Sequence, residues 1–161
     1  MPDKLPNPVK QTLVQNAAHR ILQCNPLLTR SESEGTKRAR AITIAWQAEL
    51  ALVHHLNGFV AEYPVAGLNE RFDLVDTVDR VVYELKTSGN TPGHEFYKDI
   101  FKVIAHNRKQ PDNRYYHFVF LVPSPGAASL NRGLGWQAMA IATEFGLNVN
   151  VWSVSEPLTL L

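Results

Sequence analysis

Acidic and basic side chains gather in one short stretch, 71–86, whose other residues are mostly apolar. Asp73 lies near its start, and Glu84 and Lys86 stand two residues apart at its end. A polar turn separates two β-prone runs, 71–75 and 81–86, which are predicted to pair as an antiparallel hairpin. Pairing across the hairpin would bring the carboxylates of Asp73 and Glu84 together. Two converging carboxylates repel each other, and a proton or a bound cation relieves that repulsion.

The second run of the hairpin places an acid and a base on one face. Side chains alternate along a strand, so Glu84 and Lys86 share a face with Val82, while Tyr83 and Leu85 take the opposite face. A purely structural interpretation remains open. In an ordinary α/β protein, Glu84 and Lys86 would form a surface ion pair worth ~0–1 kcal/mol.

Length and composition indicate one folded domain. The chain has 161 residues, of which 45% are hydrophobic and 19% charged, and its formal net charge is +1. This excludes a disordered chain, and no apolar run reaches the ~18 residues that a membrane span needs. The first residues lack the order of a signal peptide, so we expect a cytoplasmic protein without a membrane partner. A net charge near zero leaves nucleic-acid binding open, because binding depends on local charge.

Two helices are predicted before the hairpin. The first covers 8–22 and, with the polar run 29–35, makes an N-terminal arm, 1–35, ahead of a core at 36–161 within one domain. The second runs from about Lys37 to Asn57. Glu49 falls within the apolar stripe of this second helix, where a long acid either reaches solvent or points at the Asp73–Glu84 pair.

The rest of the chain alternates between strands and helices. A strand at 59–65 leads into the hairpin, and a loop with two glycines, 87–93, follows it. We expect a helix at 94–109, a buried strand at 115–122, a helix at 128–145 and a strand at 147–154, while 156–161 stay unassigned. The residues of the helix 94–109 expected to face inward are Phe96 or Tyr97, Ile100, Phe101, Val103 and Ile104.

Several polar residues near these elements are candidates for contacts to nucleic acid. Several of them are basic residues that recur along one side of a predicted helix. A basic stripe of this kind usually faces solvent, but next to the hairpin it could contact phosphate groups. The candidates are Lys98, Lys102 and Lys109 on the helix 94–109, Lys37, Arg38 and Arg40 on the second helix, and Ser88 and Asn90 in the loop 87–93.

The motif and the order of elements together resemble the PD-(D/E)xK nuclease superfamily, which has the restriction-endonuclease-like fold. Asp73 takes its first motif position and Glu84 with Lys86 the second, while Phe72 replaces the proline of the name. The resemblance covers about 37–154. It implies an α/β fold with a central mixed sheet of about five strands flanked by helices, in the order αβββαβαβ, with an extra N-terminal helix.

The resemblance also implies an activity. Asp73, Glu84 and the backbone carbonyl of Leu85 would hold Mg²⁺ or Mn²⁺, Lys86 would orient the attacking water, and Glu49 would hold a second ion or order water. We therefore expect a metal-dependent DNA endonuclease, with a restriction-type enzyme as the favoured form. The small size, and an apolar face on the helix 8–22, suggest a homodimer. The alternatives are a structure-selective junction or repair nuclease and a non-catalytic nucleic-acid-binding or interaction module on the same fold.

Overall fold

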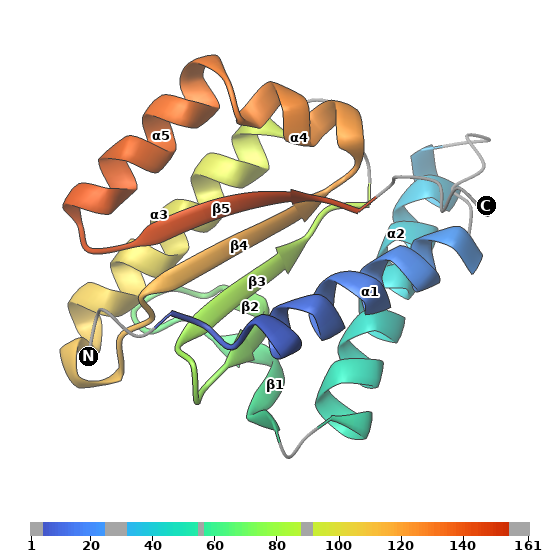
Figure 1. Ribbon diagram of the computed structural model, residues 1–161, viewed down its shortest axis with the longest axis horizontal. Coiled ribbons are helices and arrows are strands. Elements are labelled where there is room, and N and C mark those ends of the chain that lie inside the picture. The colour runs from blue at the N-terminus through green and yellow to red at the C-terminus, as the bar shows by residue number, and fades with distance from the viewer. Residues whose placement is uncertain (1–4, 25–31, 55–56, 88–91, 155–161) are drawn as a thin grey trace.

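A five-stranded mixed sheet forms the centre of the molecule (Figure 1). The computed structural model describes residues 5–24, 32–54, 57–87 and 92–154. The strands follow one another across the sheet in chain order, β1-β2-β3-β4-β5, with β1, β2 and β3 antiparallel and β3, β4 and β5 parallel. The α/β class and the mixed sheet are therefore confirmed. The strands are β1 (Phe59–Pro64), β2 (Arg71–Asp76), β3 (Val81–Leu85), β4 (His117–Val122) and β5 (Asn148–Ser153).

The helices follow the expected order, but α2 begins earlier than expected and the last predicted helix is replaced by two. They are α1 (Pro8–Cys24), α2 (Glu32–Ala48), which continues into a π-helical turn η1 (Glu49–Val53), α3 (Gly93–Lys109), α4 (Ser124–Leu130) and α5 (Gly133–Glu144), with a short 3-10 turn at Pro111–Asn113. The α2 helix begins at Glu32, inside the run predicted as a loop. No described helix has both the length and the apolar character needed to cross a membrane.

The helix predicted over 128–145 is divided into α4 and α5. α4 ends at Leu130, and Gly133, the first residue of α5, has a φ of +56°, a left-handed conformation that turns the chain between the two helices. Gly135 then passes so close to Leu130 that an added Cβ would lie 2.1 Å from the Leu130 carbonyl oxygen. The two glycines therefore allow two short helices to pack against the sheet where one straight helix was expected.

The helices cover the sheet as two layers (Figure 1). One face carries α1 and α2, and Val14, Ala17 and Trp46 are buried there together with Tyr83. The indole of Trp46 donates a hydrogen bond to the Val14 carbonyl at 3.2 Å, which ties α1 to α2. The apolar side of α1 is thus covered by its own chain, and it no longer supports the expected homodimer. The proposed division at residue 35 stays a prediction.

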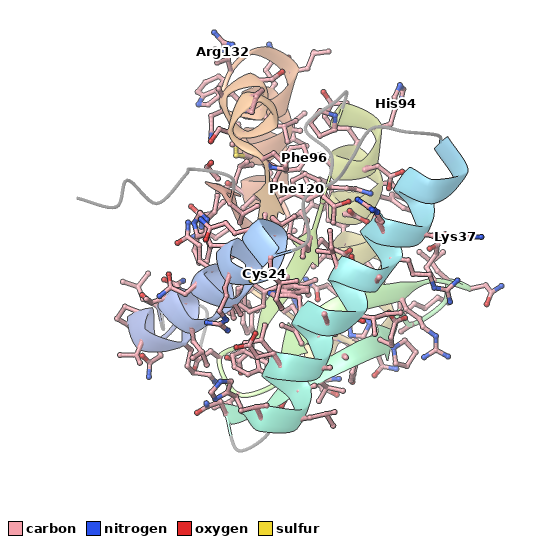
Figure 2. The ribbon with its side chains drawn as sticks, turned by 90° about the vertical axis from the view of Figure 1, so that its right-hand side faces the viewer. Cys24, Lys37, His94, Phe96, Phe120 and Arg132 are labelled. Carbon is pink, nitrogen blue, oxygen red and sulfur yellow. The ribbon has the colours of Figure 1, made fainter. Side chains whose placement is uncertain are left out.

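The other face carries α3, α4 and α5, and α3 is rotated from its expected orientation. Phe96 packs into the core with its ring 5.2 Å from that of Phe120, and Figure 2 shows the two side chains in the interior. Of the alternatives Phe96 and Tyr97, Phe96 is the residue that faces inward, whereas Phe101, which we also expected to face inward, is exposed. Lys102, expected on an exposed basic stripe, is buried instead and points at β2 and β3. This rotation decides which basic groups reach the acidic pair.

Candidate active site

Asp73 on β2 and Glu84 on β3 meet as predicted. The backbone N–H of Asp73 donates a hydrogen bond to Glu84 Oε1 at 3.3 Å, and the backbone N–H of Leu85 donates to Asp73 Oδ2 at 3.1 Å. The regular pairing of β2 with β3 covers Leu74 to Asp76 and stops before Asp73. At Asp73 the carboxylates therefore replace the backbone bonds of the ladder, and each carboxylate is fixed by the opposite strand.

A distortion of β1 accompanies this break. Glu62 has a φ of +53°, which a non-glycine residue seldom adopts, and it is missing from the pairing of β1 with β2. The side chain of Gln47 on α2 fills the gap, donating from Nε2 to the Asp73 carbonyl at 2.7 Å and to Glu62 Oε1 at 2.8 Å. Both backbone polar groups of Asp73 are thus bonded by side chains. Unusual backbone conformations of this kind concentrate at functional sites.

Lys102 on α3 lies against the acidic pair. Its ammonium group donates to Glu84 Oε1 at 2.8 Å, to the Arg71 carbonyl at 2.9 Å, and forms an ion pair with Asp99 Oδ1 at 2.9 Å. An ammonium group has three N–H donors, so all of them are used within the protein. Glu84, Asp99 and Lys102 are each no more than 5% exposed. Lys102 is therefore an internal counter-ion, and it is not placed to contact a phosphate.

Burial raises the carboxyl pKa values in this cluster. Desolvation raises the pKa of Asp73, opposed by its hydrogen bonds to Glu84 and Leu85. Desolvation, followed by the charges of Asp73 and Asp99, raises the pKa of Glu84 well above its usual value. Desolvation raises the pKa of Asp99 to about 6, although Lys102 opposes this. Burial disfavours the charged Lys102, but the attraction of Glu84 and Asp99 outweighs burial and raises the Lys102 pKa. These carboxyl groups are therefore easier to protonate than exposed ones, and a cation bound beside them would oppose that effect.

An open cleft of about 370 Å³ exposes this cluster between α2 and α3. Arg40 of α2 and Lys98 of α3 lie among the residues that line it. Lys86 lines it too, and its amine pairs with Glu95 Oε2 at 2.9 Å, which lowers the pKa of Glu95. Lys98 pairs with Glu70 at 3.1 Å across the cleft. Basic side chains thus surround the acidic floor, partly masked by surface acids.

The structure brings four predicted site residues together and leaves Glu49 apart. Asp73, Glu84, Leu85 and Lys86 all line the cleft. Glu49, at the start of η1, forms an ion pair with Arg20 of α1. Two positions along a helix differ by about 200°, so Glu49 faces α1 where Gln47 faces the sheet. The expected third carboxylate at the site is therefore not Glu49, and the amide of Gln47 takes the place next to Asp73.

The candidate DNA contacts divide in the same way. Arg40 and Lys98 line the cleft. Lys37 and Arg38 are exposed on α2 outside this lining, and Figure 2 shows Lys37 pointing outward. Lys109 packs across Gly67, where an added Cβ would lie 3.0 Å from the lysine Cγ. Ser88 and Asn90 fall outside the described residues.

Three residues of the site were not predicted: Gln47, Glu95 and Asp99. Asp99 precedes Lys102 by three residues, a spacing at which oppositely charged side chains pair on a helix, and this was a readable signal. Glu95 lies in the first turn of α3, where acids are common for electrostatic reasons alone. Nothing in the sequence distinguishes Gln47 from a surface glutamine.

The donor atoms suit a hard divalent cation only in part. Within the described residues, no group of three or more His, Cys, Asp or Glu side chains is arranged to hold a metal ion. Two carboxylates are present, however, and Mg²⁺ is commonly bound through one or two carboxylates, with water and substrate phosphate completing its shell. A bound cation would also offset the repulsion between Asp73 and Glu84, which contributes to the raised pKa of Glu84. Asp73, Glu84 and the Leu85 carbonyl thus fit such an ion, with water completing its shell when no substrate is bound.

Comparison with protein-family models, with curated proteins and with solved structures gave no match.

Proposed function

We propose that this protein is a metal-dependent DNA endonuclease that hydrolyses phosphodiester bonds in the cleft between α2 and α3. The observation that carries the proposal is the contact of Asp73 with Glu84 on the floor of a cleft lined by Arg40 and Lys98. A cleft with an acidic floor and basic walls suits a phosphodiester, because the walls attract the phosphates and the floor holds a cation. The restriction-endonuclease-like fold and the PD-(D/E)xK family belong to the same proposal.

Each residue has a role in this proposal. Asp73, Glu84 and the carbonyl of Leu85 would hold Mg²⁺ or Mn²⁺, which neutralises charge on the phosphate and lowers the pKa of a bound water. Lys86 lines the cleft, where its amine forms an ion pair with Glu95. It exchanges Glu95 for the substrate and orients the attacking water or stabilises the charge on the phosphate.

Cleavage assays test the proposal. Plasmid and oligonucleotide DNA are incubated with Mg²⁺ or Mn²⁺, and in parallel with EDTA. We expect cleavage that requires the metal and falls by at least ~100-fold in Asp73→Asn and Glu84→Gln, because each removes a ligand charge while keeping the side-chain shape. Asp112→Asn is the control, since Asp112 is exposed in the Pro111–Asn113 turn and lies outside the cleft lining. Cleavage that survives EDTA, or that persists in Glu84→Gln, overturns the proposal.

The substrate class needs its own experiment. Long random-sequence DNA, a four-way junction, a flap and a single strand are compared, and the ends of the products are mapped. Shared short palindromes at the ends support a restriction-type enzyme, and cutting confined to junctions or flaps supports a structure-selective repair nuclease. Cutting both strands of a duplex favours two sites related by a two-fold axis, so the particle mass in light scattering tests the homodimer.

One observation favours a non-catalytic alternative. Lys102 already neutralises part of the acidic cluster, through bonds to both Glu84 and Asp99. A nucleic-acid-binding module on this fold would retain such a pair for stability alone. Salt-dependent DNA binding without cleavage under every metal condition would select this alternative.

A further inference from the structure

We infer that the site holds a single divalent cation, because the ammonium group of Lys102 permanently occupies the place that a second ion would take. This inference rests on the proposed function, and it assigns the number of metal ions to the same site.

The oxygen atoms already in use carry the first part of the argument. Glu84 Oε1 accepts hydrogen bonds from Lys102 Nζ at 2.8 Å and from the Asp73 backbone N–H at 3.3 Å. A carboxylate oxygen has two lone-pair directions, so Oε1 is filled and only Oε2 is left for a metal ion. Asp73 Oδ2 also accepts one bond, from the Leu85 N–H at 3.1 Å. Glu84 Oε2 and the oxygens of Asp73 are therefore the atoms with which the pair would share one ion.

The position of Lys102 carries the second part. A second ion in a two-metal nuclease site lies near the first and shares a carboxylate with it. On the side of α3, Asp99 offers a carboxylate beside Glu84, and the Lys102 ammonium bridges the two, with distances of 2.8 Å to Glu84 and 2.9 Å to Asp99. On the side of β1, Glu62 offers a carboxylate beside Asp73, and its Oε1 already accepts a hydrogen bond from Gln47 Nε2 at 2.8 Å. Its third N–H is held by the Arg71 carbonyl at 2.9 Å. With three bonds to the protein and 5% exposure, the ammonium group is fixed in that bridge.

The test counts bound ions in the absence of DNA. Metal-free protein is titrated with Mn²⁺ at about pH 8, and free Mn²⁺ is followed by electron paramagnetic resonance, with calorimetry as a second count. We expect one Mn²⁺ per chain in the wild type and none in Glu84→Gln. Lys102→Met opens the bridge, so we expect two ions per chain, and the double variant Lys102→Met/Asp99→Asn should return to one.

A matched control separates the bridge from a general change of charge. Lys98→Met removes a lysine from the same helix and the same cleft, but Lys98 is exposed and pairs with Glu70. We expect one ion in this variant. Two ions in the wild type, seen as a spin-coupled Mn²⁺ spectrum, overturn the inference and leave the proposed function standing. One ion in a folded Lys102→Met also overturns it, whereas no binding in the wild type overturns the inference and the proposed metal site together.

A second measurement decides the matter if Lys102→Met does not fold. The buried ammonium group of Lys102 should give a slowly exchanging ¹H–¹⁵N signal in wild-type protein, assigned by its loss in Lys102→Arg. We expect the signal to persist when the site is saturated with Mg²⁺, because ion and lysine occupy different places. Its disappearance on saturation would show that the ion displaces Lys102 from the carboxylates.

Discussion

The substitution Asp99→Asn is expected to change the way in which the stability of the fold depends on pH. Burial raises the pKa of Asp99 from 3.8 to about 6, and Lys102 opposes this only in part. A carboxyl group with a higher pKa in the folded than in the unfolded chain binds its proton more tightly when folded. The contribution of Asp99 to the free energy of unfolding is therefore largest below pH 3.8. It decreases as the pH rises from there through about 6. The amide in the Asp99→Asn variant has no proton to lose in this range, so the variant lacks this decline.

The size of the effect follows from the two pKa values. The difference between 3.8 and about 6 corresponds to about 3 kcal/mol, since each pH unit is worth about 1.4 kcal/mol. The Asp99 charge also raises the pKa of Glu84, so its removal flattens the pH dependence of Glu84 as well. The difference in unfolding free energy between Asp99→Asn and the wild type should therefore shift by about 3 kcal/mol in favour of the variant from about pH 4 to about pH 7.

Urea unfolding of metal-free protein, followed by tryptophan fluorescence at a series of pH values, measures this gain. Asp112→Asn makes the same chemical change at an exposed position of the Pro111–Asn113 turn, and its curve should follow that of the wild type. The test uses the change in this stability difference with pH. The difference at any single pH also includes the loss of the ion pair between Asp99 and Lys102. If the curves of Asp99→Asn and the wild type run parallel over the whole range, burial does not perturb Asp99 as argued.

Two further predictions concern the elements that shape the site. Gln47→Leu leaves the Asp73 carbonyl without its 2.7 Å bond, which should cost ~1–3 kcal/mol in chemical denaturation. Gln137→Leu on the exposed side of α5 should cost under about 0.5 kcal/mol, and an equal loss at both positions would contradict the role given to Gln47. Gly58→Ala should cost more than the ~1–2 kcal/mol of a left-handed alanine, because its φ is +84° and the new Cβ would lie 2.6 Å from Val78 Cγ2. Gly133→Ala, with a φ of +56° and nothing within 4 Å of its Cβ, should show the conformational cost alone, so equal losses would refute the steric argument.

Local patterns predicted the strands and the acidic pair well. In a strand, the period of two assigns each side chain to a face without knowledge of the rest of the chain. The hairpin of β2 and β3, the shared face of Val82 and Glu84, and the meeting of Glu84 with Asp73 all followed from this rule. The order of helices and strands was equally accessible, because their lengths and turn residues are local features.

Helix orientation was less accessible. The pattern on α3 predicted that Phe101 faces inward and Lys102 outward, and the structure has the reverse for these two residues. A lysine has a long apolar stem that can pack at the edge of a core. A lysine whose ammonium group pairs with buried carboxylates therefore looks the same in the sequence as a surface lysine. Asp99 and Glu84 are what make the buried orientation of Lys102 favourable, and they lie on different elements.

The sequence by itself determined the α/β class, the hairpin and the position of Asp73 beside Glu84, since these depend on neighbours along the chain and on the period of a strand. Only the tertiary structure decided that Gln47 and not Glu49 supports Asp73, that Lys102 is a buried counter-ion, and that α4 and α5 are separate helices. Each of these depends on the rotation of a helix about its own axis or on a close approach to another element. Packing between distant segments sets both, and a change of two positions along a helix reverses the direction in which a side chain points.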